Sequence, residues 1–327
     1  MGSSRARLWA PCLLLLVAGP LEAAVDQHRH AESLYHRALQ TEKRESIDSR
    51  RLAAQLLEQA TLEAPDSVAY QMELARLYSR MGFLGLARHR YERAIGLDPR
   101  LAEAHLGDGQ MWRRDYLKYL EPSSLVKSVQ ELEAASRIAP AHARAWLDLV
   151  PLLIEQGQLK PALDAAEHAL GADATNPEGW LAVAHAAFRL GQVERADSAF
   201  RLAIPRLSRV ARERFLDIAP VASERDTARL RRLPTVAAKE AFLARFWKEQ
   251  DPDLATPENE AQLEYWSRVT QAYFLFFNPH RQEWDQRGEV YVRYGPPDKA
   301  EYNPVGMSLR FQMGRYGSFP MNVLVWS

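Results

Sequence analysis

The sequence predicts a mainly α fold, in which a solenoid of helical hairpins precedes a small α+β C-terminal domain. The first observation is a repeat with a period of about 34 residues, in which Trp146 and Trp180 are each followed at equal distances by Gly157 or Gly191, Ala162 or Ala196, and Ala169 or Ala203. The second is the loss of this pattern from Pro205 onward, and the third is an alternating apolar segment near residue 290. A fixed period of this length indicates one helical hairpin per repeat.

The most complete copy of the repeat is formed by Leu74, Ala75, Tyr78, Gly82, Ala87, Tyr91, Ala94 and Pro99. We expect small residues where the two helices of a hairpin cross, larger residues between hairpins, and a proline where the second helix ends. This pattern resembles the tetratricopeptide repeat. A weaker copy ends at Pro65, with its first helix over 31–39, and others begin near Leu101, Ala143 and Pro177. The array should therefore contain about five hairpins.

The copy that runs from Leu101 to Pro140 keeps the register only if about seven residues are inserted near Tyr116 to Pro122. An insertion here is either a longer turn between the helices or a projecting loop that helps recognition.

Residues 1–23 have the pattern of a targeting segment, with Arg5 and Arg7 followed by the apolar run Leu8–Ala18. We therefore expect export and a secreted or periplasmic location. The run is shorter than the roughly 20 residues of a membrane span, but an uncleaved membrane anchor remains an alternative, as does a lipid on Cys12. Because Cys12 is the only cysteine, the mature chain should have no disulfide, thiol nucleophile or cysteine metal ligand.

The expected domains are the repeat array over 24–210, arginine-rich capping or linker helices over 211–236, and a C-terminal α+β domain over 237–327 that the given sequence leaves incomplete. The arginines near 206–232 suit a solvated face or a contact with an anionic partner. The 42 basic and 42 acidic residues of the chain balance, so we expect no nucleic-acid partner.

Within the C-terminal domain we expect a helix over 239–249 and a second helix opened by Thr256-Pro257-Glu258. The second helix is too aromatic to remain in water. Alternation over 289–294 predicts a strand, against which this helix would pack. Further strands are expected over 309–313 and 322–326.

The same region resembles the GWxTD domain of exported bacterial proteins. The match rests on Phe246-Trp247, on Asp251 to Glu260, and on Trp284, Asp285, Arg287, Gly288, Tyr291, Arg293, Gly295, Pro296, Pro297 and Asp298. The resemblance implies an architecture beside tetratricopeptide repeats and no known reaction. Glu283 stands where the family motif has glycine, and the motif threonine is missing.

The chemistry of the chain predicts no cofactor and no metal site, because its histidines are dispersed and no His-Glu-x-x-His pair occurs. Carboxylates and arginines around Trp284 could serve an envelope hydrolase acting on a glycan or a peptide. The alternative is a turn held by salt bridges beneath a buried tryptophan, and an enzyme is the less favoured interpretation.

The favoured function is a scaffold for protein interaction or assembly, which binds a peptide or protein partner through the groove formed by the first helices of the hairpins. At one end of this groove, Arg76, Arg80, Arg113 and Arg114 should pair with carboxylates of the partner. At the other end, Leu181 and Phe188 make the groove apolar. Association with the envelope is a further expectation, and the C-terminal domain could instead act as a dimerisation cap. The predicted groove residues are Met72, Arg76, Arg80, Leu106, Gln110, Arg113, Arg114, Leu181, His185 and Phe188.

Overall fold

The computed structural model describes residues 18–278, 283–297, 300–303, 308–310, 316–318 and 323–326, with side chains over 24–278 and 283–297. The chain divides into two compact units, Met1–Gly107 and Asp108–Ser327. The division lies inside a helix of the repeat array, and the C-terminal helices belong to the same unit as the last hairpins.

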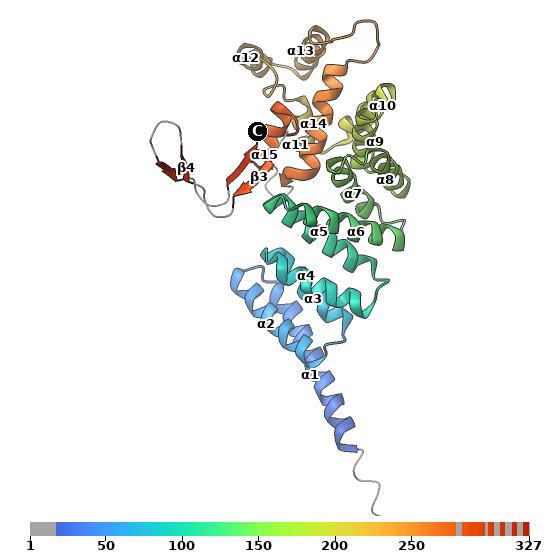
Figure 1. Ribbon diagram of the computed structural model, residues 1–327, viewed down its shortest axis with the longest axis vertical. Coiled ribbons are helices and arrows are strands. Elements are labelled where there is room, and N and C mark those ends of the chain that lie inside the picture. The colour runs from blue at the N-terminus through green and yellow to red at the C-terminus, as the bar shows by residue number, and fades with distance from the viewer. Residues whose placement is uncertain are drawn as a thin grey trace, which may run out of the picture. The chain divides into compact units, whose positions relative to one another are not determined.

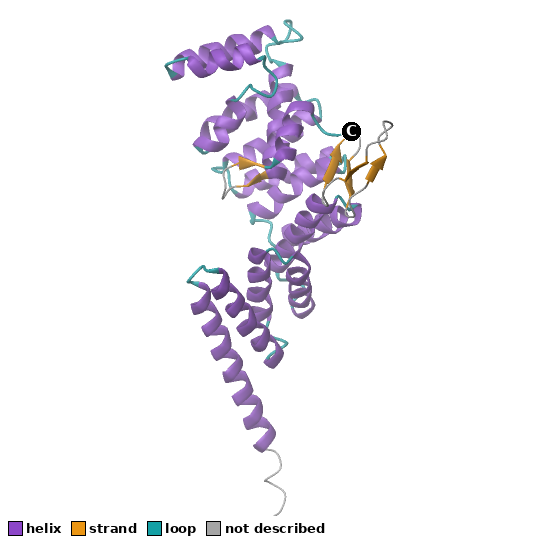
Figure 2. Cartoon of the chain, turned by 90° about the vertical axis from the view of Figure 1, so that its left-hand side faces the viewer, coloured by secondary structure: helices purple, strands orange, loops and turns teal. Residues whose placement is uncertain are grey.

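Helices make up most of the described chain (Figures 1 and 2). The hairpin array consists of α1 (Ala18–Glu42), α2 (Ile47–Glu63), α3 (Val68–Met81), α4 (Leu84–Leu97), α5 (Ala102–Tyr119), α6 (Pro122–Ile138), α7 (Ala143–Glu155), α8 (Leu159–Ala172), α9 (Pro177–Arg189) and α10 (Val193–Ala203). It is followed by η1 (Ile204–Arg206), α11 (Arg209–Leu216), α12 (Glu224–Arg232), α13 (Val236–Glu249), α14 (Glu260–Phe276) and α15 (Gln286–Tyr294).

Successive helices of the array pair as hairpins, α1 with α2, α3 with α4, α7 with α8 and α9 with α10. In the pair α5 and α6, the Ser128 hydroxyl donates to the Gly109 carbonyl at 2.8 Å. The alanines expected at helix crossings, Ala75, Ala87, Ala94, Ala162 and Ala196, are fully buried. The prediction of a helical-hairpin solenoid is therefore confirmed.

The mid-repeat glycines lie where the first helix of a hairpin ends. Gly82, Gly157 and Gly191 have φ angles of 82°, 71° and 75°. This left-handed conformation is inexpensive only for glycine. Glycine therefore suits the turn between the two helices in these three hairpins, whereas Leu120 takes the same conformation in the third hairpin, with a φ of 53°.

A repeated hydrogen bond fixes the register of the hairpins. Near the start of a first helix, one side chain donates to the main-chain carbonyl six residues earlier: Gln71 to Pro65 at 3.1 Å, His105 to Pro99 at 3.2 Å, Trp146 to Pro140 at 2.9 Å and Trp180 to Ala174 at 3.3 Å. The first and last intervals between these donors equal the tetratricopeptide period, whereas the interval from His105 to Trp146 is longer by about seven residues. The third hairpin therefore contains the insertion that the sequence predicts.

The additional residues lengthen both helices of that hairpin. Helix α5 has 18 residues and α6 has 17, whereas α3 and α4 have 14 each. Both predictions for the insertion, a longer turn and a projecting loop, are therefore wrong. The added turn of α5 carries Tyr116, whose hydroxyl donates to Glu155 at 3.4 Å, and Leu117, whose carbonyl accepts from Arg287.

The predicted strand over 289–294 is also wrong, because these residues belong to helix α15. The Asp285 carboxylate accepts from the backbone N–H of Arg287 and Gly288, so it caps the helix. The buried residues are Gly288, Tyr291, Val292 and Gly295, which follow the helical spacing of three, four and seven. The apolar alternation at Val290 and Val292 concealed this second pattern.

The helix predicted over 239–249 is confirmed as α13, which begins after its cap Thr235. Helix α14 begins later than predicted, because Asn259 rather than Thr256 accepts from the first turn, at 2.8 Å from the Gln262 N–H. The Thr256 hydroxyl instead donates to the Asp253 carbonyl at 2.9 Å, within the preceding turn.

The described strands form three antiparallel pairs (Figure 2). These pairs are β1 (Phe277–Asn278) with β2 (Glu283–Trp284), β3 (Ala300–Asn303) with β6 (Val323–Trp326), and β4 (Ser308–Arg310) with β5 (Tyr316–Ser318). The strands predicted over 309–313 and 322–326 overlap β4 and β6.

No helix in the described part of the chain is both long and apolar enough to cross a membrane. Residues 1–17 of the predicted targeting segment lie outside the described residues.

Candidate functional site

The first helices of the hairpins carry the predicted binding residues on one side, which we call the groove face. In the second unit this face is covered by α14, which lies beside α7 and α9 (Figure 1). Helix α14 also contacts α5 through Arg113. Helix α14 buries nine side chains, among them Leu263, Trp266 and Val269. The chain thus places its own helix on the groove face of its last three hairpins.

His185 lies at the centre of this contact and is 1% exposed. Its Nε2 is 3.0 Å from Gln271 Oε1 and its Nδ1 is 2.8 Å from the Ser267 hydroxyl. The orientation of the Gln271 side-chain amide is fixed by its own Nε2, which donates to the Pro151 carbonyl at 3.1 Å and to Glu155 at 2.8 Å. Because Oε1 can only accept, Nε2 of His185 carries the proton and Nδ1 accepts from Ser267. Burial lowers the pKa of His185 to about 3, so the ring is neutral at neutral pH.

A charged cluster holds the C-terminal end of α14. The Asp148 carboxylate, whose side chain is 3% exposed, accepts from Gln110 at 2.7 Å and from Arg113 and Arg144 at 2.9 Å each. The other terminal nitrogen of Arg113 donates to the Phe274 carbonyl. The last carbonyls of a helix have no partner within the helix and attract cations, so this guanidinium caps α14.

The opposite end of the contact is apolar and aromatic. The rings of Phe200 and Trp266 lie 5.6 Å apart, and Leu181 and Leu263 are almost completely buried. The Trp266 indole donates to the Phe215 carbonyl at 3.3 Å. Hydrophobic burial at one end and a buried ion pair at the other determine the direction in which α14 lies.

The predicted groove residues of the second unit therefore do not form an open surface. Leu181 and His185 are buried beneath α14, while Gln110 and Arg113 are bound to Asp148. The other two, Phe188 and Arg114, are half-buried and exposed, respectively. The aromatic residues of α14 correctly predict that this helix is covered. It packs against α7 and α9, however, and not against the predicted strand over 289–294, which is helical.

In the first unit the predicted arginines are already paired with acids that the prediction overlooked. Arg76 contacts Glu73 at 3.4 Å and Glu103 at 2.5 Å. Arg80 contacts Glu42, and Glu73 at 3.5 Å. The two arginine side chains are still 43% and 45% exposed, Leu106 is half-buried, and Met72 is buried. The surface is therefore a row of alternating charges rather than a basic end.

Three residues of the C-terminal motif, Asp285, Arg287 and Gly288, hold helix α15 in place. Asp285 caps the helix and holds Arg287 at 3.0 Å, while Arg287 also donates to the Leu117 carbonyl and lies 5.0 Å from the Phe276 ring centre. A Cβ on Gly288 would lie 2.7 Å from the Cβ of Trp284. Asp285, a candidate for acid–base work, therefore has a structural role.

The remaining motif residues differ in their surroundings. Tyr291 is buried, Gly295 has a φ of 87°, Arg293 and Pro296 are exposed, Pro297 is half-buried, and Asp298 lies outside the described residues. Within the described part of the chain, no three His, Cys, Asp or Glu side chains gather as metal ligands.

The fold and the groove face define a tetratricopeptide-type α-solenoid. Similar solved structures include PilF of Pseudomonas aeruginosa, with 20% identity over 67% of this chain and 99% of that protein and a TM-score of 0.48. MamA of Desulfovibrio magneticus RS-1 has 18% identity over 55% and 94% of the two chains, with a TM-score of 0.46. A thermophilic TPR protein of Thermus thermophilus has 18% identity over 54% and 91%, with a TM-score of 0.40.

No protein-family model matches the chain, and no curated protein matches it. The resemblance of its C-terminal residues to the GWxTD domain stays a prediction.

Proposed function

We propose that this protein is an interaction scaffold, which binds a helical or extended segment of a partner protein on the groove face of its first unit. The observation that carries the proposal is the position of α14 on the groove face of the second unit. A helix held there in cis supports the use of the same positions of the repeat for a segment of a partner.

Those positions have counterparts in the first unit. In the register set by the repeated hydrogen bond, His185 corresponds to Arg76, and Leu181 corresponds to Met72. Where His185 donates to Gln271 in the second unit, the first unit presents exposed, paired arginines. A partner segment that carries both carboxylate and basic side chains could exchange with these ion pairs, whereas a purely acidic segment would meet Glu42, Glu73 and Glu103.

We also propose that the protein is exported and works in the cell envelope. The support is the pattern of residues 1–23 and the resemblance of the C-terminal residues to the GWxTD domain. In this proposal, α14 and α15 of the C-terminal domain are held on the array by Arg113 of the lengthened α5, which donates to Phe274, and by Arg287, which donates to Leu117 of α5.

The test is capture of a partner by the full-length tagged protein in its host, compared with the double variant Arg76→Glu/Arg80→Glu. The control is Arg93→Glu/Arg100→Glu, which reverses the same number of charges on exposed arginines of the same unit. We expect a discrete partner with the wild type and the control, and at least tenfold less with the groove variant, whose circular dichroism spectrum should show that it stays folded. Equal capture by the groove variant would remove the groove face from the account.

A further inference from the structure

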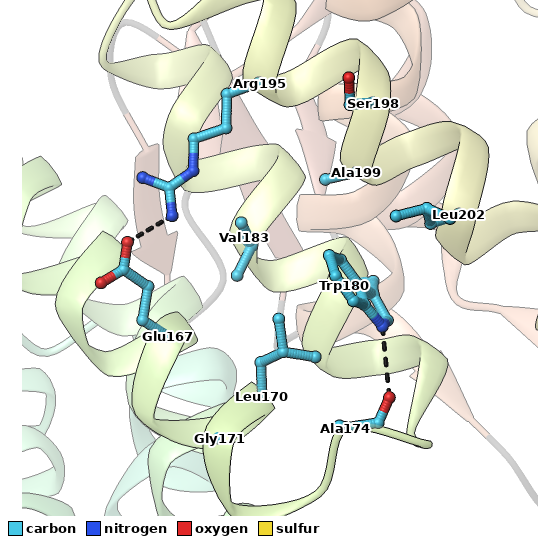
Figure 3. A pocket seen from close by; sticks show the side chains of 10 residues that line it. All are labelled: Glu167, Leu170, Gly171, Ala174, Trp180, Val183, Arg195, Ser198, Ala199 and Leu202. Atoms are coloured by element: carbon cyan, nitrogen blue, oxygen red, sulfur yellow. Dashed lines mark hydrogen bonds and ion pairs between the residues drawn. The ribbon is translucent and has the colours of Figure 1, made fainter.

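A hollow of about 570 Å³ opens between helices α8, α9 and α10 of the second unit, on the side that α14 does not cover (Figure 3). Its apolar wall is formed by Leu170, Trp180, Val183 and Leu202. At one edge, Arg195 is paired with Glu167. A volume of this size lies within the range of roughly 300–1,000 Å³ found for ligand pockets.

The hollow and α14 use different sides of α9. Trp180 and Val183, three residues apart, line the hollow, whereas Leu181 and His185, four residues apart, lie beneath α14. Residues three or four apart share one side of a helix. The hollow is therefore open while the groove face of the same hairpins is covered.

The indole of Trp180 offers only apolar surface to the hollow. Its one polar group, Nε1–H, already donates to the Ala174 carbonyl at 3.3 Å, as Figure 3 shows. A tryptophan whose N–H is satisfied presents a large, rigid ring with a negative face. Leu170 and Leu202 extend that surface on neighbouring helices, and Leu202 remains 37% exposed.

The preceding repeat shows what covers a tryptophan at this position. Trp146 is the counterpart of Trp180, and its ring is stacked against His168 at 4.5 Å between centroids and 19° between planes. One repeat later, the counterpart of His168 is Leu202. An aliphatic residue therefore stands in the last hairpin where the preceding hairpin supplies its own planar ring.

We propose that the hollow beside Trp180 is a docking site for an aromatic side chain of a partner protein. The ring stacks on Trp180 as His168 stacks on Trp146, and it packs against Leu170 and Leu202. The guanidinium of Arg195 and the carboxylate of Glu167 lie at the edge, where they meet the partner's main-chain carbonyl and N–H groups. This site is separate from the groove face of the first unit and does not depend on it.

The test uses the full-length protein and N-acetyl-4-fluoro-L-phenylalaninamide as the probe, with binding read from the ¹⁹F line width. The ligand is small, so a dissociation constant on the order of 1 mM is expected. N-acetyl-L-phenylalaninamide should compete with the probe several-fold better than N-acetyl-L-leucinamide, because a stacked ring contributes beyond its buried area.

Two variants are taken from the chain's own preceding repeat. Leu202→His places at 202 the residue type of its counterpart His168, whose ring covers Trp146. Gly171→Arg places at 171 the residue type of its counterpart Arg137, and a Cβ on Gly171 meets no atom within 4 Å. Each should weaken the probe by about tenfold or more. The control is Gly96→Arg in the first unit, at the corresponding position of another second helix, also with an open Cβ position.

Saturable broadening that persists in the control and is lost in Leu202→His supports the site. The proposal is overturned by broadening that does not saturate, by equal binding to Leu202→His, or by equal competition from the leucine amide.

Discussion

Replacing Asp148 should lower the free energy of unfolding strongly if α14 is held by the buried charged cluster. Its carboxylate is shared by Gln110, Arg113 and Arg144, and it fixes the guanidinium that caps α14 at Phe274. In Asp148→Ala the Arg113 side chain, 12% exposed, is left without its counter-charge. Removing one partner of a buried ion pair costs about 3–5 kcal/mol, so the variant should lose that much of its free energy of unfolding.

A second variant separates the buried charge from the lost packing. Arg113→Met combined with Asp148→Leu removes both charges and fills a similar volume with apolar atoms. Such replacements are often neutral or stabilising by about 1–4 kcal/mol. We expect the double variant to recover at least half of the loss. The matched control is Arg209→Met/Glu213→Leu, an exposed pair whose removal should leave the unfolding midpoint unchanged.

The assay is urea unfolding followed by circular dichroism and tryptophan fluorescence, with the slope of each transition compared among variants. A loss below about 1 kcal/mol in Asp148→Ala would refute the buried role of Asp148. A double variant as unstable as Asp148→Ala would refute the explanation by an uncompensated charge.

Three further predictions concern single residues. The pKa of His185 falls from 6.5 to about 3 on folding, so its contribution to the free energy of unfolding is intact above pH 6.5 and decreases by about 1.4 kcal/mol per pH unit below that value. The difference in unfolding free energy between the wild type and His185→Gln should therefore change by about 2 kcal/mol between pH 7.5 and pH 5. A difference that does not depend on pH would contradict a neutral, buried ring. Gly288→Ala places a Cβ 2.7 Å from Trp284 and should cost about 1–3 kcal/mol, measured by urea unfolding, whereas an unaltered midpoint would show that α15 is not packed there. Gly191→Ala should cost about 1–2 kcal/mol of thermal stability because φ is 75°, while Gly171→Ala, with an open Cβ position, should be neutral or slightly stabilising; the opposite order would contradict the turn geometry.

The hairpin array could be predicted from the sequence because its signals are local. Alanine at helix crossings and glycine after the first helix are needed within one repeat, so they recur with its period. The counterparts of Trp146 in the earlier hairpins, Gln71 and His105, were missed because they share only a side-chain N–H donor. Counting back from Trp146 with the insertion of the third hairpin included would have revealed them.

The occupied groove could not be predicted, because its contacts join residues far apart in the chain. His185 and Ser267 meet only after α14 has folded back on the array. The acids that pair with Arg76 and Arg80 come from three helices, so the sequence pattern of one helix suggested a basic surface. In α15, the helical spacing of the buried residues is present in the sequence, but the alternation of valines predicts a strand over the same residues.

The position of α14 on the groove face of the second unit is tested most directly by a disulfide cross-link. Cys12 is the only natural cysteine, so His185→Cys and Ser267→Cys can be combined with Cys12→Ser. Nδ1 of His185 lies 2.8 Å from the Ser267 hydroxyl, so thiols placed at these two positions face each other across the contact, and oxidation should join them to a much greater extent than the control pair. The control pair, Ser198→Cys with Ser267→Cys, places one thiol at the hollow and should remain reduced. Equal cross-linking of the two pairs, or none at 185 and 267, would contradict the account.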